Sequence, residues 1–348
     1  MNFESVVRTI RISVDYLKHN RNLTLAIGAG LLAAVLLMVY VVLTTPRFNW
    51  QSTVYHPSLT APRLLDGRLV HRQRANLKPV AMVIENHAEA RPLAGLDQAS
   101  IVYEIVVEGD ITRFLAIFDG DFNVKKIGPV RSIRPFFIDL AEEWGAVLLH
   151  SGGSPDGLTQ VKTSSVFDIN EISSDGIYFW RDANRTPPHN LYTSSALVNR
   201  ALIAKKVNPA ATFSPWLFKE DAPMKSSEVV SDVQVAFSVN PEYDVSYKYN
   251  VASNDYSRLV NGATDKTDRG IVLKAKNIIV QEVSAKIVDS YGRLAVGLSG
   301  RGLATVYQDG QTIEATWKNL TGRTRFYNQT GAEIAFNRGS IWIELLAK

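Results

Sequence analysis

The sequence of 348 residues contains no cysteine. Disulfide bonds, thiolate nucleophiles, iron–sulfur clusters and cysteine-ligated zinc sites are therefore excluded. A lipid anchor of the lipoprotein type is excluded as well, since that lipid is attached through a cysteine. Any folded domain of this chain must depend on packing of its core alone.

Complete catalytic motifs are also missing. The sequence has no G-x-S-x-G, no H-E-x-x-H and no G-x-x-x-x-G-K-[ST], which are the signatures of serine hydrolases, zinc proteases and phosphate-binding loops. No cofactor can be named from the residues, and metal binding stays open.

Outside the N-terminus, positive and negative side chains nearly balance, so the net charge is small. The net charge is +4, and residues 1–22 supply half of it through four basic and two acidic side chains. The rest of the chain is nearly neutral, so a basic surface for nucleic acid is not expected.

One long hydrophobic run is present, from Leu23 to Leu43, without a single charge. As a helix it would span roughly 30 Å, the thickness of the hydrocarbon core of a bilayer. Basic residues precede it, and they favour a cytoplasmic tail over residues 1–22 and an extracytoplasmic body. The alternative is a cleaved signal peptide, but such hydrophobic regions are shorter, and residues 41–46 resemble an A-x-A cleavage site poorly. The sequence thus predicts a single-pass signal anchor in the cell membrane.

Hydrophobic periodicity divides the rest of the chain. Residues 45–78 lack a period and are predicted to form a stalk. Residues 79–206 predict an α/β domain with a mixed sheet, because apolar runs typical of strands covered on both faces alternate with amphipathic helices. The predicted strands are Val80–Ile84, Ile101–Val107, Phe114–Phe118 and Ala146–Leu149, and the predicted helices are Ile133–Trp144, one beginning at Ser154, and one over about 194–207.

The C-terminal part has a different pattern. Residues 207–229 contain three prolines and are predicted to be a linker or crossover. Residues 230–346 alternate polar and apolar side chains, with recurring turn signals, and predict an antiparallel β domain. Asp309-Gly310 is the strongest two-residue hairpin signal.

Histidines lie at two predicted strand ends. His150 is followed by Ser151, Gly152, Gly153 and Ser154. At the carboxyl end of a strand, such a turn before a helix could hold an anion or a carbonyl group. The alternative is a tight turn followed by a helix that Ser154 caps.

Glu85 and His87 follow another apolar run, and His189 is the last histidine of the chain. A carboxylate and an imidazole two residues apart could act as a base and its partner, or supply two metal ligands. The alternative is a polar loop. If Glu85, His87, His150 and His189 meet at the strand ends, they form a candidate catalytic set.

Arginine is the third feature of the α/β segment. Arg113, Arg131 and Arg134 lie near predicted strand ends or turns. Arginine suits bidentate binding of carboxylate or phosphate. The alternative is that these residues form ion pairs with nearby acidic side chains.

Several segments of the chain form a dense pattern. They include Glu85-Asn86-His87, Gly128-Pro129-Val130-Arg131-Ser132, His150-Ser151-Gly152-Gly153-Ser154, Pro188-His189-Asn190-Leu191-Tyr192 and Gly339-Ser340-Ile341-Trp342-Ile343. This pattern resembles the YerB-like lipoproteins of bacteria, a family with an N-terminal and a C-terminal module. The resemblance covers about residues 79–346 and implies an extracytoplasmic bacterial protein, without a known activity or catalytic residues. Relatives of the lipoprotein type carry a lipidated cysteine, and this chain has none.

The sequence leads to three hypotheses on function, of which the third assigns neither a ligand nor a reaction. The first is an envelope protein that binds an anionic cell-wall polymer or peptide through Arg113, Arg131, Arg134 and the His150–Ser154 turn. The second is an envelope hydrolase or transferase that uses the histidines and Glu85. The third is a structural partner of a membrane complex.

Overall fold

The computed structural model of the protein describes residues 25–26, 29–37, 59–223 and 232–348. Residues 29–37 are helical. Within these ranges, no helix has both the length and the apolar character needed to cross a bilayer. The predicted tail at 1–22 lies outside the described residues, as do parts of the predicted anchor, stalk and linker. Residues 58–348 form one compact unit.

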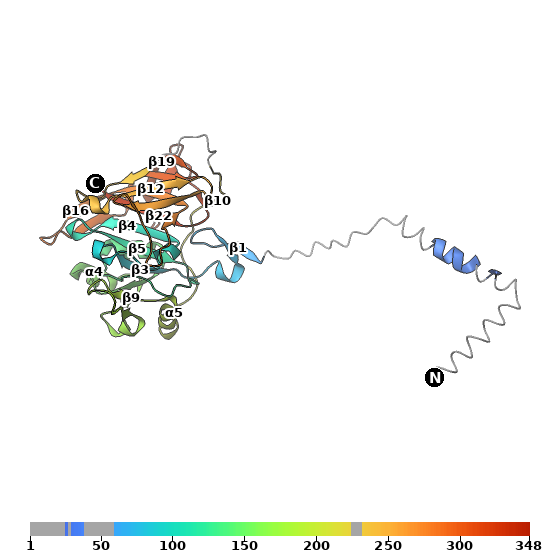
Figure 1. The fold of residues 1–348 in the computed structure, drawn as a ribbon, viewed down its shortest axis with the longest axis horizontal. Helices are drawn as coiled ribbons and strands as arrows, with labels where there is room; N and C mark the ends of the chain where they lie inside the picture. The colour runs from blue at the N-terminus through green and yellow to red at the C-terminus, as the bar shows by residue number, and fades with distance from the viewer. Residues whose placement is uncertain (1–24, 27–28, 38–58, 224–231) are drawn as a thin grey trace. The chain divides into compact units, whose positions relative to one another are not determined.

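The centre of this unit is an 11-stranded mixed sheet, in which strands from both halves of the chain lie side by side (Figure 1). Its path runs β20-β19-β18-β16-β22-β4-β5-β3-β6-β7, and β17 pairs with β16. From the N-terminal half come β3 (Val80–Glu85), β4 (Ile101–Val106), β5 (Thr112–Phe118), β6 (Val147–His150) and β7 (Phe167–Asn170). From the C-terminal half come β16 (Asn277–Ile287), β17 (Leu294–Gly297), β18 (Gly300–Gln308), β19 (Gln311–Asn319), β20 (Arg325–Asn328) and β22 (Ile341–Ala347).

The last strand, β22, joins the two halves. It pairs in parallel with β16 on one side and with β4 on the other. The strand is central because Ile341, Trp342, Ile343 and Leu345 are at most 2% exposed, so both of its faces are covered.

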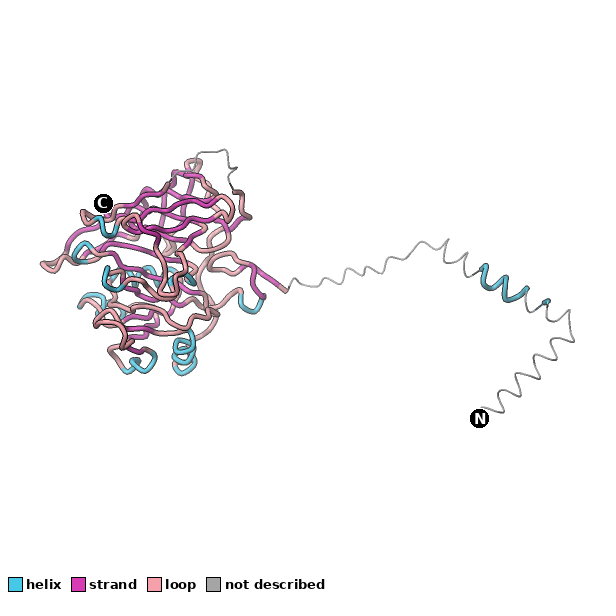
Figure 2. The backbone as a smooth tube through the Cα atoms, in the orientation of Figure 1, coloured by secondary structure: helices cyan, strands magenta, loops and turns pink. Residues whose placement is uncertain are grey.

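A second, five-stranded sheet is antiparallel throughout. It consists of β11 (Val233–Val235), β12 (Val245–Asn250), β13 (Asp255–Val260), β14 (Ala263–Thr264) and β15 (Lys274–Ala275). Three short pairs complete the strands, which dominate the trace in Figure 2. They are β1 (Thr60–Pro62) with β2 (Leu69–His71), β8 (Trp180–Arg181) with β9 (Leu191–Tyr192), and β10 (Phe218–Lys219) with β21 (Phe336–Asn337).

The α-helices of the compact unit are short and begin as their sequences predict. They are α3 (Pro135–Glu143), α4 (Pro155–Val161) and α5 (Ser195–Ala204). Proline occupies the first turn of α3 and α4, where its missing N–H costs nothing. The Ser154 side chain caps α4 by accepting a hydrogen bond from Gly157 N–H at 3.2 Å. Six 3₁₀ turns are also described: η1 (Arg72–Arg74), η2 (Ala88–Ala90), η3 (Leu96–Gln98), η4 (Glu108–Asp110), η5 (Ser174–Tyr178) and η6 (Pro241–Tyr243).

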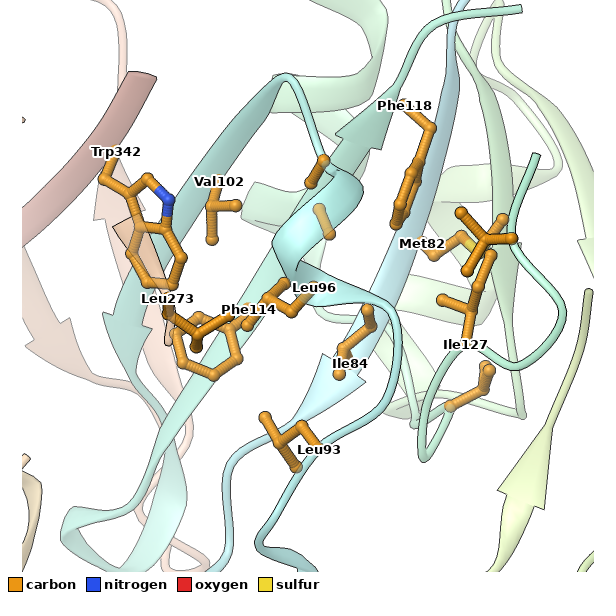
Figure 3. Close-up of a cluster of buried hydrophobic side chains, with 14 of the residues drawn as sticks. Met82, Ile84, Leu93, Leu96, Val102, Phe114, Phe118, Ile127, Leu273 and Trp342 are labelled. Carbon is orange, nitrogen blue, oxygen red and sulfur yellow. The ribbon is translucent and has the colours of Figure 1, made fainter. Parts of the chain in front are cut away.

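The large sheet has a hydrophobic core on each face. Val80, Met82 and Ile84 of β3 face one core, which also includes Phe114, Trp342 and Leu273, the residue directly before β15 (Figure 3). The alternate residues Ala81 and Val83 face the other core, where α3 packs. Burial of both faces explains why residues 80–84 of β3 are an unbroken apolar run.

The structure confirms the predicted strands at 80–84, 101–107, 114–118 and 146–149, and the three predicted helices, within a few residues at their ends. The Asp309-Gly310 hairpin is confirmed, with positive φ at both residues, as a tight two-residue turn requires. The protein is rich in sheet and has few helices in the described ranges. Its C-terminal region is largely antiparallel, but β22 runs parallel to both of its neighbours.

Candidate functional site

Polar side chains gather at one edge of the large sheet. β3 ends at Glu85, and the parallel strand β6 ends at His150. Residues 131–133 join the two ends by backbone hydrogen bonds. Arg131 N–H donates to Val83 O, Ser151 N–H donates to Arg131 O, and Ile133 N–H donates to Gly152 O. This edge is the position where ligands bind in open α/β sheets.

Glu85 holds two of the predicted site residues. Its Oε1 lies 2.9 Å from Arg131 Nε, and its Oε2 lies 2.9 Å from His189 Nδ1. Because Nδ1 faces a carboxylate, it carries the hydrogen, and in the neutral ring the lone pair lies on Nε2. His189 Nε2 is 3.4 Å from Glu89 Oε2. Arg131 and His189, which are distant from Glu85 in sequence, therefore meet at its carboxylate.

His87 joins the same cluster. Its ring stacks on that of His189, with centroids 4.9 Å apart and an angle of 20° between the planes. One ligand atom each from His87, Glu89 and His189 lies within 4.8 Å of the others. Two imidazoles and a carboxylate at this separation can hold a metal ion.

Two of the three predicted arginines, Arg113 and Arg131, lie next to Glu85, and Arg134 is close enough to Arg113 for its charge to act on it. Arg113 is opposite Glu85 in the pairing of β3 with β5, and its Nη1 donates to Ser132 O at 2.9 Å. Burial, together with the positive charges of Arg134 and Arg131, lowers the pKa of Arg113 to about 9. Positive charge is therefore concentrated at this edge.

Arg134 is engaged by Glu108. Its Nε and Nη2 donate to the two carboxylate oxygens at 2.5 Å and 2.7 Å, a bidentate pair. Burial alone would raise the pKa of Glu108, but these hydrogen bonds and the charge of Arg134 outweigh it and lower the pKa. Arg293 Nε lies 4.0 Å from the same carboxylate.

The polar side chains of the His150–Ser154 turn have partners in the turn itself and in the chain around it. His150 is fully buried, with Nδ1 2.8 Å from Gly152 O and Nε2 3.1 Å from Asp168 Oδ2. A Cβ on Gly153 would lie 2.6 Å from Ile133 Cγ1. Ser151 Oγ donates to Glu171 Oε2 at 2.8 Å. Both nitrogens of His150 are thus occupied by partners other than Glu85 and His189.

Two acidic residues of the site are not among the predicted ones. Glu89 lies in η2, and Glu108 lies in η4 after β4. The sequence signal for Glu89 was its spacing of two positions from His87. The sequence signal for Glu108 was its place among the acidic residues after the strand at 101–107.

A largely buried charged network lies between the two sheets. Arg258 Nη2 donates to Glu104 Oε2 at 2.6 Å, and Arg258 Nη1 pairs with Asp265. Burial alone would lower the pKa of Arg258, but the two carboxylates raise it well above its ordinary value. Burial and the charge of Glu104 raise the pKa of Glu344 far above its usual range, and Tyr247 donates a hydrogen bond to it.

Comparisons with known proteins agree with this architecture. The N-terminal domain of the DUF3048 family of proteins of unknown function matches residues 65–208, and its C-terminal domain matches residues 233–343. The Bacillus subtilis protein named "Putative lipoprotein YerB" is 33% identical over 290 residues, which cover 83% of this chain and 86% of that protein. The crystal structure of YerB from the same organism is similar with a TM-score of 0.74 at 32% identity, over 82% of this chain and 96% of that one. This chain belongs to the DUF3048 family.

Proposed function

We propose that this protein is a membrane-associated extracytoplasmic protein that binds an anionic ligand of the cell envelope at Arg113 and Arg131. The name of the Bacillus relative, a lipoprotein, supports the location. Since this chain has no cysteine, its anchor cannot be a lipid on cysteine. The uncharged run from Leu23 to Leu43, of which the structure describes residues 25–26 and 29–37, is the proposed anchor.

The observation that carries the binding proposal is an excess of guanidinium groups at the sheet edge. Among the described residues, the carboxylates next to Arg113, Arg131 and Arg134 are those of Glu85 and Glu108. Burial is the main cause of the lowered pKa of Arg113, and the positive charges of Arg134 and Arg131 add to it, so Arg113 is a buried cation with two further cations nearby. A bound carboxylate or phosphate would supply the missing negative charge.

Arg131 is the residue through which a ligand can reach this charge. Its side chain is 29% exposed, whereas Arg113 is buried. Arg131 contacts Glu85 through Nε. The two terminal nitrogens of a guanidinium form the fork that matches a carboxylate or phosphate.

Calorimetric titration of the full chain in detergent tests the proposal. The probes are a peptidoglycan stem peptide with a free carboxylate and a glycerol phosphate oligomer, which separate the two anion chemistries. Arg131→Gln should weaken binding of the preferred probe at least tenfold, about 1.4 kcal/mol. Arg301→Gln, in the exposed part of β18, is the matched control and should leave it unchanged. Equal affinities of Arg131→Gln and the wild type would refute the site.

A second candidate function rests on the contact of Glu85 with His189. A carboxylate that orients an imidazole at 2.9 Å is the arrangement of a general base and its partner. The protein would then be an envelope hydrolase or transferase. Release of new termini from cell-wall material by the full chain, lost in His189→Gln, would support this role, and activity that persists in the variant would exclude it.

A further inference from the structure

We infer that His87, Glu89 and His189 form a binding site for a divalent transition-metal ion of the zinc class. The inference does not depend on the anion-binding proposal, because none of these residues belongs to the arginine cluster of Arg113, Arg131 and Arg134. It rests on the geometry of the three ligand atoms, on the carboxylate behind His189 and on the way the surrounding chain holds the loop.

The ligand atoms already lie near the separations that a metal ion requires. Ligands on a tetrahedron with zinc–ligand distances of about 2.0–2.1 Å are about 3.3 Å from one another. His189 Nε2 and Glu89 Oε2 are 3.4 Å apart. The widest separation in the set is 4.8 Å. The Glu89 side chain is 75% exposed and His87 is half-buried, so rotations of these two side chains can close the remaining gap.

Glu85 prepares His189 for a metal. Metal-binding histidines usually donate their second N–H to a carboxylate, which fixes the tautomer and makes the ligating nitrogen more basic. Glu85 Oε2 accepts from His189 Nδ1–H at 2.9 Å, which leaves the lone pair of Nε2 directed toward Glu89. Glu85 itself is buried and tied to Arg131, so this arrangement is rigid.

The loop that carries His87 and Glu89 is fixed from beneath. Asn86 is buried, and its Nδ2 donates to Glu104 Oε1 at 3.0 Å and to Thr112 Oγ1 at 2.7 Å. Arg91 Nε donates to Asn86 Oδ1 at 3.0 Å. The loop that carries His189 is fastened to this one, because Arg185 donates to Ala90 O. A site assembled on anchored loops needs little reordering on binding.

In the structure described, His87 caps η2. Its Nδ1 accepts a hydrogen bond from Glu89 N–H at 3.2 Å, in an exposed position. A metal ion would either compete with Glu89 N–H for the lone pair of His87 Nδ1, or bind His87 Nε2 after the imidazole ring rotates. Since water can satisfy an exposed N–H, the loss of this contact costs little.

The donor set defines the class of ion. Two imidazoles and one carboxylate suit zinc and its transition-metal neighbours, whereas calcium and magnesium prefer oxygen ligands alone. Three protein ligands leave a fourth coordination position free, and the exposed side of Glu89 faces solvent. The site is therefore open to a water molecule or to a group of a bound ligand.

The test uses the full chain without a histidine tag, stripped with EDTA and dialysed against zinc chloride. Elemental analysis should find one zinc ion per chain, and titration should show affinity at least tenfold weaker in His87→Gln and in Glu89→Gln. The matched control is His71→Gln. His71 caps η1 and accepts from Gln73 N–H at 3.4 Å, as His87 does in η2, but it is not part of the His87–Glu89–His189 cluster.

Zinc content well below one per chain in the wild type would overturn the inference. Unchanged affinity in both His87→Gln and Glu89→Gln would overturn it as well, and so would loss of zinc in the His71→Gln control alone. Because His87 and Glu89 are not buried, both variants should fold, and a thermal unfolding curve of each zinc-free variant should match that of the zinc-free wild type.

Discussion

Glu85 Oε2 and His189 Nδ1 are 2.9 Å apart, although 104 positions separate the two residues in the sequence. The other oxygen of the same carboxylate contacts Arg131. Glu85 thus connects the arginine cluster with the imidazole pair, and a change in its charge should affect the two sides in opposite directions.

Replacement of Glu85 by glutamine should weaken zinc binding and strengthen anion binding. Without the carboxylate, His189 loses the partner that makes Nε2 more basic, and loss of such a partner typically lowers metal affinity 10–100-fold. Arg131 loses its counter-charge and becomes a better anion site, by a fewfold or more. Calorimetry of Glu85→Gln with zinc and with the anionic probe measures both effects.

The control for this variant is Glu171→Gln. Glu171 accepts hydrogen bonds at the same edge, from Ser151 and Arg181, but it does not contact His189 or Arg131. Its replacement should leave zinc affinity unchanged. If Glu85→Gln bound zinc as tightly as the wild type, Glu85 would not support the metal site.

The strands of this fold could be predicted where burial on both faces leaves an unbroken apolar run, as in Val80–Ile84. The position of Ile341–Ala347 could not, because its partners β4 and β16 lie far away in sequence and parallel pairing leaves no local signal. The helix α4 was recognisable from Ser154 and Pro155 at its start, and α3 from the helical spacing of its apolar residues before Gly145.

Part of the candidate site was also accessible from sequence. Polar residues directly after apolar strands indicated Glu85, His87 and His150, and Glu85 and His87 do meet His189. His150 instead pairs with Asp168, a contact between neighbouring strands β6 and β7 that depends on sheet order. Glu89 had only its spacing from His87 as a signal, which was too weak to select it, because its direction is set by the single turn of η2 and not by a repeating pattern.

Arg258→Met should destabilise the protein by about 3–5 kcal/mol, because it leaves Glu104 buried without its cation. Methionine would keep much of the packing of Arg258 on Trp342, whose ring centroid is 5.1 Å from the guanidinium carbon. Urea unfolding at pH 7 measures the change. Arg301→Met, on an exposed position of β18, should shift the free energy of unfolding by no more than about 0.5 kcal/mol.

Additional replacement of Glu104 by glutamine in the Arg258→Met background should recover part of the loss, since a buried charge is then removed. If the Arg258→Met variant unfolded at the same urea concentration as the wild type, the ion pair would contribute nothing to stability.

The free energy of unfolding of Glu344→Gln should rise relative to that of the wild type as pH increases from about 4.5. Burial and the charge of Glu104 raise the folded-state pKa of Glu344 far above its ordinary value. Above the unfolded pKa of about 4.3, the unfolded chain releases this proton and the folded protein keeps it. Stability of the wild type therefore falls as pH rises, by up to about 1.4 kcal/mol per pH unit, until the folded pKa is reached.

Glutamine has no proton to lose at this position, so the variant lacks this part of the pH dependence. The quantity to measure is the difference in free energy of unfolding between Glu344→Gln and the wild type at several pH values. Glu314→Gln, on an exposed position of β19, should give a difference that does not change with pH. Parallel curves for Glu344→Gln and the wild type would show that Glu344 ionises normally in the folded protein.

A chain that ends at Gly339 should lose cooperative unfolding in both halves of the sheet. Removal of β22 exposes the edges of β16 and β4, which it joins, and opens the core on both faces. Thermal unfolding followed by circular dichroism and tryptophan fluorescence would detect the loss. A chain that ends at Ala347 keeps β22 complete and is the matched control. If the shorter chain kept a sharp transition, the N-terminal half would be stable without the C-terminal strand, and the two matched family domains would be independent folding units rather than parts of one sheet.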